Sequence, residues 1–420
     1  MPGSDLCRRR PRRVSRGASL SLVFVTVLAT AAATDSLPRD PGAQDRPPAA
    51  RPSGPGALAP VAAGAPVTGA PPPGPRAGDP PPAGPAADEG TVARAAAAAE
   101  ADGKSGARAA GEAVRRSGDR WGAVYDRREY ETFRQALDGQ YTGVGLWARR
   151  SGDGRVEVAR VRAGGPAGRA GIRAGDRLRT IDGAAVDRRP VTEVVGLLRG
   201  RDRTHVALGL ERAGRSWTQS LTRTTLSTES VTVERLDDGA VVIKVVAFTR
   251  GTGTRVREAV RTAPEGAGVL LDLRGNSGGL VHEAVDAASA FLDGGLVATY
   301  DVRGKERALY AAPGGDTARP VVALVDGGTM SAAELVTGAL KDRGRAVTVG
   351  ARTFGKGSVQ MPSELPDGSV AELTVGHYRT PAGHDVDGEG IAPDLPAGEG
   401  AQQRARNVLD GLGTAPGASD

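Results

Sequence analysis

Three continuous apolar segments in the second half of the chain constrain its fold more than any other feature. They are residues 241–248 (VVIKVVAF), 268–273 (GVLLDL) and 321–325 (VVALV). Unbroken apolar runs are typical of strands that are buried on both faces of a parallel sheet. The intervening segments, 255–263 and 282–292, predict helices. Strands that alternate with helices predict an α/β domain, which we place at residues 226–400.

A serine follows the third apolar run, where the predicted strand gives way to a helix. Ser331 stands just before residues 332–340, which predict that helix, and Gly344 suits the position just past its C-terminus. Backbone N–H groups and the positive end of a helix dipole face a residue at such a turn. Ser331 is therefore the candidate nucleophile.

Lysine is scarce in this chain, and one lysine stands in a Gly-Lys-Gly turn. Only five of the 55 Lys and Arg residues are lysine, so arginine supplies positive charge almost everywhere. A guanidinium stays protonated in proteins, whereas a buried ammonium can lose its proton. Lys356 is therefore a candidate general base for a serine hydroxyl. The competing interpretation is a loop lysine whose charge faces solvent.

Two neighbouring segments resemble the catalytic core of the C-terminal processing peptidases. They are residues 328–350 (GTMSAAELVTGALKDRGRAVTVG) and 354–360 (FGKGSVQ). In that family a serine, a lysine 25 residues later and a glutamine four residues further on form the active site, and here this spacing selects Ser331, Lys356 and Gln360. Met330 and Ala333 replace an alanine and a serine that are usual in the family, while the nucleophile position is intact. The resemblance implies a crotonase- and ClpP-like α/β core.

Residues 139–225 resemble a PDZ domain, a module that is mostly β with two short helices. Gly143, Val144, Gly145 and Leu146 match the carboxylate-binding loop, whose backbone N–H groups hold the C-terminus of a peptide. PDZ domains bind by adding a peptide strand to an exposed sheet edge. The alternative interpretation is a structural module that serves as a fixed lid.

The loop at residues 272–279 (DLRGNSGG) supports two interpretations. It resembles the nucleophile loop of HtrA-type, trypsin-fold proteases, in which Ser277 would attack with the help of a His-Asp pair. However, the only upstream histidine, His205, lies inside the presumed PDZ domain, and HtrA proteases carry their PDZ domain after the catalytic region. A similar loop in the processing peptidases contributes glycine amides to the oxyanion hole. That resemblance implies Gly278 and the N–H of Ala332 as the oxyanion donors.

The first 90 residues predict export rather than a folded domain. Arginines precede an apolar run that ends in small residues, so residues 1–33 predict a signal peptide or an uncleaved membrane anchor. Residues 34–90 are rich in Pro, Ala and Gly and predict a disordered linker. The sole cysteine, Cys7, lies in the leader, which leaves the mature protein without disulfides or thiolate chemistry. We expect an extracytoplasmic protein that is either secreted or membrane-anchored.

Two further segments complete the predicted organisation. Residues 91–138 predict a helical segment, in which Tyr130, Phe133 and Leu137 lie on one helix face that packs on the next domain. Residues 401–420 are rich in Gly and Ala and predict a flexible tail.

Together these features predict an exported serine endopeptidase that recognises protein C-terminal tails through its PDZ domain. The four histidines show no metal-ligand spacing, so we expect no metal and no other cofactor. Much of the net charge of +6 comes from the arginine-rich leader, so we expect no nucleic-acid partner. The alternative from another class is a peptide-binding protein that keeps the fold but lacks catalysis. The sequence does not define the physiological substrate or the oligomeric state.

Overall fold

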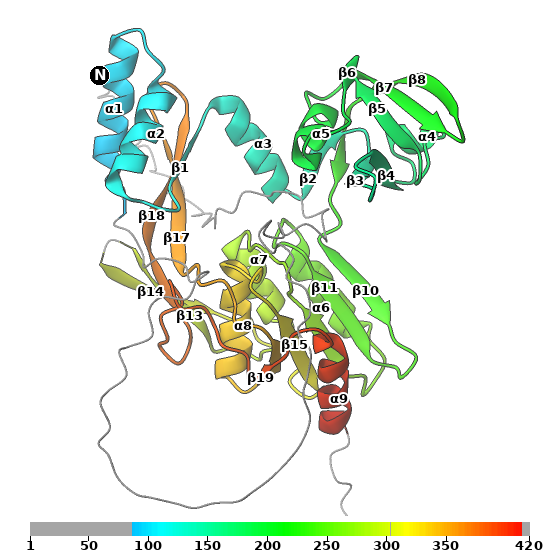
Figure 1. The fold of residues 1–420 in the computed structure, drawn as a ribbon. Helices are drawn as coiled ribbons and strands as arrows, with labels where there is room; N and C mark the ends of the chain where they lie inside the picture. Colours follow the sequence, from blue (N-terminus) through cyan, green and yellow to red (C-terminus); the bar gives the residue numbers. More distant parts are fainter. Residues whose placement is uncertain (1–85, 303, 414–420) are drawn as a thin grey trace, which may run out of the picture.

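The computed structural model describes residues 86–302 and 304–413, and its largest domain is built on a six-stranded sheet (Figure 1). The strand order is β10-β11-β12-β15-β16-β19, in which β10 is antiparallel to β11 and the other neighbours are parallel. The strands are β10 (Val231–Arg235), β11 (Val241–Val245), β12 (Val269–Asp272), β15 (Val321–Val325), β16 (Val347–Gly350) and β19 (Leu395–Pro396). Because β12 and β15 are parallel neighbours, the loops that follow them leave the sheet at the same edge.

Helices cover both faces of this sheet. On one face, Ile243, Leu271 and Ala323 share a core with three helices, α6 (Thr252–Arg261), α7 (Val281–Ala288) and α8 (Ala332–Asp342). On the other face, Val242, Leu270 and Val322 share a core with α9 (Ala401–Gly413). Neighbouring residues in a strand point to opposite faces, so an unbroken apolar run serves both layers.

The helix α9 corrects the expectation of a flexible tail over residues 401–420. Ala401, Ala405 and Leu409 are buried at a spacing of four residues, which places them on one helix face against the sheet. Small residues allow a close approach to the strands, and the Gly and Ala content that predicted fraying instead permits this packing. Residues 414–420 lie outside the described part of the chain.

The segment that resembles a PDZ domain forms its own sheet, with the strand order β3-β4-β5-β7-β8 and β6 beside β5. Its elements are β3 (Leu146–Arg150), β4 (Val156–Val161), α4 (Pro166–Arg169), β5 (Arg177–Ile181), β6 (Ala184–Ala185), α5 (Val191–Leu198), β7 (His205–Arg212) and β8 (Arg215–Thr222). The chain enters through β2 (Gln140–Gly143) and leaves through β9 (Thr224–Ser227), and these two strands pair with each other. The module therefore has a separate core and is attached through a two-stranded ribbon.

A third sheet joins the N-terminal part of the described chain to strands from its second half. Its long strand β18 (Val370–Arg379) pairs with β17 (Ser358–Glu364), with β13 (Leu296–Val302) and with the N-terminal strand β1 (Ala123–Tyr125). The strand β14 (Lys305–Tyr310) extends the sheet beyond β13. Two helices, α1 (Glu89–Ala101) and α2 (Gly106–Ser117), lie beside this sheet at the upper left of Figure 1. They share a hydrophobic core with Ala371 and Leu373 of β18.

The helix α3 (Arg127–Leu137) connects β1 to the PDZ ribbon. It begins with a capping box, in which Asp126 and Glu129 each accept a hydrogen bond from the other's backbone N–H. Phe133 stacks on Tyr125, with ring centroids 5.2 Å apart, and Leu137 packs on Leu280. The apolar face of this helix thus contacts both β1 and the loop after β12.

The leader at 1–33 lies outside the described residues, as does the linker at 34–90 up to residue 85. Across the described residues, we find no helix that combines the length and apolar character needed to span a membrane.

Candidate active site

Ser331 lies between β15 and α8 in a strained backbone conformation. Its φ of 57° and ψ of −120° fall in a region that residues other than glycine rarely occupy. Such strain is retained where the surrounding structure imposes it, and it is concentrated at active sites. The side chain is fully buried, and its Oγ makes no hydrogen bond with any described residue. The hydroxyl is thus held in place by its backbone and is not engaged in the fold.

Lys356 lies in the segment between β16 and β17 and is 0% exposed. Burial lowers the pKa of Lys356 to about 7, although carboxylates of Asp387, Glu372, Glu334 and Asp119 oppose that shift. The energetic cost of burying an ammonium away from solvent therefore exceeds the attraction of the nearby carboxylates. A substantial fraction of this amine is neutral at neutral pH, which a surface lysine does not achieve.

A single buried carboxylate holds the serine and the lysine together. Oε2 of Glu334 accepts hydrogen bonds from the N–H of Ser331 (2.8 Å) and from the N–H of Lys356 (2.9 Å). Oε1 accepts from the hydroxyl of Thr353 (2.6 Å) and the N–H of Gly355 (2.7 Å). Burial raises the pKa of Glu334 while these four donors lower it, and burial has the larger effect. The turn at Ser331 and the turn at Lys356 are therefore both hydrogen-bonded to the Glu334 side chain.

The role of Glu334 was not predicted from the sequence. The signal was present, because a glutamate three residues after a serine at a helix start is the pattern of a capping box. The glutamate half of that box is formed, through the Ser331 N–H. The Glu334 carboxylate also accepts hydrogen bonds from Thr353, Gly355 and Lys356. These residues lie about 20 positions away in sequence, and the capping-box pattern does not encode them.

Gln360 is fully buried in β17 beside the lysine turn. Its Nε2 donates to Oγ of Ser358 (2.9 Å) and to Oγ1 of Thr374 on β18 (3.2 Å). The pairing of β17 with β18 changes register between Val359 and Gln360, as in a β-bulge. A bulge of this kind redirects a side chain relative to the regular alternation of a strand.

Gly278 and Ala332, the expected oxyanion donors, both flank Ser331. A Cβ atom at position 278 would lie 3.0 Å from the Ser331 Cβ and 3.1 Å from the Ala332 nitrogen, and Gly278 has a φ of 95°. The N–H of Ala332 donates to no acceptor among the described residues. The N–H of Gly278 instead donates to Oδ1 of Asn276 (2.9 Å). The two groups are adjacent, but the Gly278 amide is engaged by Asn276 in this conformation.

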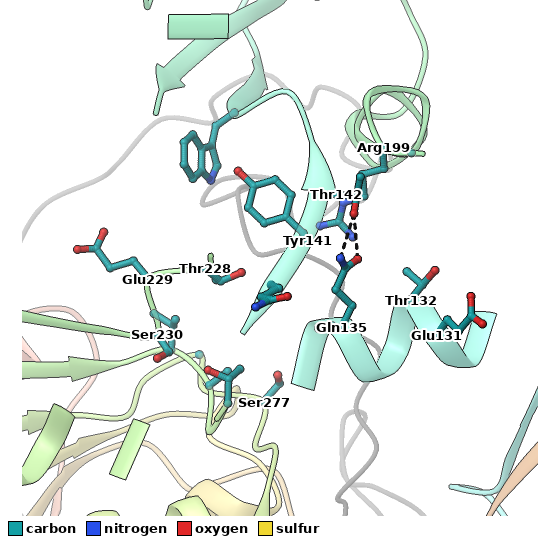
Figure 2. A pocket seen from close by; sticks show the side chains of 18 of the residues that line it. Glu131, Thr132, Gln135, Tyr141, Thr142, Arg199, Thr228, Glu229, Ser230 and Ser277 are labelled. Carbon is teal, nitrogen blue, oxygen red and sulfur yellow. Dashed lines mark hydrogen bonds between the residues drawn. The ribbon is translucent and has the colours of Figure 1, made fainter. Parts of the chain in front are cut away.

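A cleft of about 1380 Å³ lies between the module that resembles a PDZ domain, α3 and the domain of the six-stranded sheet. Figure 2 shows Tyr141 and Thr142 of β2 and Arg199 on the PDZ side, with Gln135 of α3 bonded to Thr142. Ser277 and the residues Thr228–Ser230 line the opposite side. The cleft thus extends from β2, which precedes the predicted peptide-binding loop, to Ser277, which precedes Gly278, whereas Ser331 and Lys356 are not part of its lining.

The predicted carboxylate-binding loop joins β2 to β3. Gly143, Val144 and Gly145 are buried, and Gly145 has a φ of 76°. The strand β3, which begins at Leu146, pairs only with β4 within its sheet and packs beside α5. It is therefore an edge strand next to a helix, which is the arrangement that peptide addition requires.

Ser277 and His205 lie in different domains, and His205 pairs through its ring with Thr222 inside the PDZ sheet. In the part of the chain that the structure describes, no group of three or more His, Cys, Asp and Glu side chains is arranged to hold a metal ion.

Comparison with known proteins identifies the two domains. Residues 239–397 match the model of peptidase family S41, and residues 157–212 match a PDZ domain. The chain is 32% identical over 284 residues to the carboxy-terminal processing protease CtpA of Bacillus subtilis (strain 168), covering 66% of this chain and 61% of that protein. It is 36% identical over 298 residues to the chloroplastic carboxyl-terminal-processing peptidase 3 of Arabidopsis thaliana, covering 66% of this chain and 57% of that protein. The structure of the photosystem II D1 C-terminal processing protease is similar over 74% of this chain and 86% of that chain, with 32% identity and a TM-score of 0.47.

The fold is an α/β domain linked to a smaller module that has its own sheet and its own core. Residues 239–397 form a domain of peptidase family S41, a family of hydrolases, and residues 157–212 form a PDZ domain. It spans about six-tenths of the length of the two curated relatives. The family match and the parallel sheet exclude the trypsin-fold alternative, which would have made Ser277 the nucleophile.

Proposed function

We propose that this protein is an exported serine endopeptidase that captures protein C-terminal tails through its PDZ domain and cleaves them with Ser331 and Lys356. The observation that carries the proposal is the shared carboxylate of Glu334, which places the backbone of a strained serine beside that of a fully buried lysine. A buried amine that is partly neutral near pH 7 suits a general base.

In the proposed reaction, Lys356 moves a proton from Ser331 to the leaving amine. Neutral Lys356 accepts the proton of the Ser331 hydroxyl as Oγ forms a bond to the carbonyl carbon of the scissile peptide. The carbonyl oxygen becomes an oxyanion, which the N–H of Ala332 stabilises, and one such donor contributes roughly 10²–10³-fold in rate. The lysine ammonium then returns a proton to the leaving amine, the C–N bond breaks, and water hydrolyses the acyl-serine. Gln360 would hold the lysine amine through its side-chain carbonyl without adding a charge.

Gly278 can join the oxyanion hole if its N–H leaves Oδ1 of Asn276. Together with the complete burial of Ser331, this bond suggests that substrate binding rearranges the loop after β12. The proposed tail-binding site is formed by Gly143, Val144, Gly145 and Leu146, at the edge strand β3. A tail held there has access to the cleft that reaches Ser277, beside Gly278.

We expect the rate of peptide cleavage to rise with pH through an apparent pKa near 7. Burial lowers the pKa of Lys356 to about 7, so the amine is protonated and unable to accept a proton below that value. The neutral base becomes more abundant as the pH rises, and the rate therefore increases. The measurement is kcat/KM of the purified protein on a fluorogenic peptide between pH 5 and 9. A rate that is flat across this interval, or that falls from pH 6 to 8, would contradict the general-base role of the lysine.

The second candidate is a peptide-binding protein that has the fold but does not cleave, and the full burial of Ser331 and Lys356 favours it. A serine-directed acylating probe separates the two functions. We expect the probe to label Ser331, as located by mass spectrometry of the digested protein. Labelling should be absent in Ser331→Ala and retained in Ser277→Ala. A protein that binds tail peptides but is not labelled in their presence would support the binding-only function.

The proposed location rests on the leader at 1–33 and the linker at 34–90, which would separate an anchored or secreted enzyme from the membrane. Fractionation with an antibody against the catalytic domain tests it, and full-length protein in the cytosol would rule it out.

A further inference from the structure

The loop between α2 and β1 reaches the candidate active site from the N-terminal part of the described chain. Asp119 in this loop is 6% exposed and bonds to Thr374 of β18, which in turn bonds to Gln360. Two residues further on, the ring of Trp121 lies 4.8 Å from Nζ of Lys356. Asp119 and Trp121 lie outside the S41 match at residues 239–397, whereas their partners Thr374 and Lys356 lie inside it.

The hydrogen bonds of Asp119 determine which group donates and which accepts in each of the bonds that link Asp119, Thr374 and Gln360. Its Oδ1 accepts from the N–H groups of Trp121 (3.2 Å) and Gly122 (2.8 Å), and its Oδ2 accepts from those of Ala87 (3.3 Å) and Thr374 (3.0 Å). Backbone N–H groups can only donate, so the carboxylate serves as an acceptor throughout. The hydroxyl of Thr374 must therefore donate its one proton to Oδ1 of Asp119, at 2.8 Å.

This order determines the orientation of the Gln360 amide. Since the proton of the Thr374 hydroxyl is committed to Asp119, its oxygen can only accept, and it accepts from Nε2 of Gln360 at 3.2 Å. A rotated amide would place the Gln360 carbonyl oxygen against the lone pairs of Thr374, with no proton between them. The amide nitrogen is therefore held on the side of Thr374, and the carbonyl oxygen is directed to the other side.

We infer that Asp119 and Thr374 are positioning residues, which orient the Gln360 amide so that its carbonyl oxygen is presented to the amine of the general base. The inference rests on the proposed function, since it requires Lys356 to be that base. Asp119 and Thr374 do not touch the reacting atoms in this role. The loop at residues 118–122 thereby becomes part of the active site, although it lies more than 200 residues before Ser331 in the sequence.

The matched substitutions are Thr374→Val, which removes the hydroxyl and keeps the shape, and Thr374→Ser, which keeps the hydroxyl. We expect Thr374→Val to lower kcat by about 10- to 100-fold, the cost of a small misplacement of a catalytic group, with KM unchanged. Thr374→Ser should retain nearly the wild-type rate. Circular dichroism and thermal unfolding of each variant report whether the fold is kept.

A double-mutant cycle distinguishes positioning from a general effect on the fold. We expect Gln360→Ala to lower kcat by a similar factor and the addition of Thr374→Val to cause no further loss, because the hydroxyl acts through the amide. The inference would be overturned if the reductions in kcat of the two single variants multiplied in the double variant. It would also be overturned if either Thr374→Val or Gln360→Ala kept the wild-type rate. If Ser331→Ala also leaves cleavage intact, the proposed function has failed. If Ser331→Ala abolishes cleavage while Thr374→Val keeps the wild-type rate, only the inference has failed.

Asp119→Asn provides a second measurement if Thr374→Val does not fold. Lys356 faces carboxylates on four elements, Asp119, Glu334, Glu372 and Asp387, each of which favours its charged form. Removal of the Asp119 charge lowers the pKa of the lysine, so the rising limb of the pH–rate profile should move to lower pH. An unmoved limb in a folded Asp119→Asn protein would contradict the placement of Asp119 at the active site.

Discussion

Replacing Ser331 with alanine will abolish peptide cleavage and leave the protein folded. The Oγ atom makes no hydrogen bond to any described residue, so its removal costs the fold little. The strained backbone conformation is kept, since Glu334 still accepts the N–H of residue 331. Loss of a nucleophile typically lowers kcat by roughly 10⁴-fold or more, because what remains is binding and oxyanion stabilisation. The measurement is cleavage of a tail peptide by purified protein, with circular dichroism as the check on folding.

The matched control for this prediction is Ser277→Ala. Ser277 stands in the sequence GNSGG, which resembles the nucleophile loop of another protease class, yet it lines the open cleft rather than the buried site. We expect Ser277→Ala to retain substantial activity. If Ser277→Ala were inactive while folded, and Ser331→Ala active, the assignment of the nucleophile would be wrong.

Lys356→Arg will be as inactive as Lys356→Ala. Arginine keeps the positive charge, but its guanidinium does not lose a proton at accessible pH and so cannot accept one from the serine. If the lysine merely supplied charge, arginine would serve, as it does at most positions of this chain. The expected loss in kcat is comparable to that of Ser331→Ala, since the hydroxyl is a weak nucleophile without its base. The measurement is peptide cleavage by the purified variant across the same pH range as the wild type.

Two further variants make the lysine experiment decisive. Lys356→Met fills a similar apolar volume without a charge and should fold, which separates loss of the base from crowding by the larger arginine. Lys104→Arg changes an exposed lysine that pairs with Asp102, and it should keep the wild-type rate. Near-wild-type cleavage by Lys356→Arg would leave the protein as a binding module or as an enzyme with another base.

The sequence predicted the elements that carry the nucleophile because their patterns are local. The strand over 321–325 corresponds to β15, and the helix expected from 332 begins at Ala332. Ser331 therefore lies at the strand-to-helix turn where the spacing placed it. The match to peptidase family S41 and to a PDZ domain confirms the two resemblances on which the functional hypothesis was built.

Contacts between distant residues could not be predicted in the same way. Asp119 and Thr374 are 255 positions apart, and no periodic pattern links an aspartate in one turn to a threonine in a strand. The engagement of the Gly278 N–H depends on a rotamer of Asn276, two residues away, which the motif does not encode. The helix at 401–413 was missed because its buried face consists mainly of alanine, which resembles low-complexity sequence until a sheet is placed beside it.

The pairing of β1 with β18 has a consequence for the order in which the molecule becomes functional. During synthesis at about 5–20 residues per second, the ribosome adds the 255 residues between Asp119 and Thr374 in roughly 13–51 s. Throughout that interval β1 has no partner strand, and contacts of such long separation form late and slowly. The contacts between β1, Asp119 and β18 therefore form only after nearly the whole chain has been synthesised. A nascent chain of this kind has no assembled catalytic centre with which to cut itself or its neighbours.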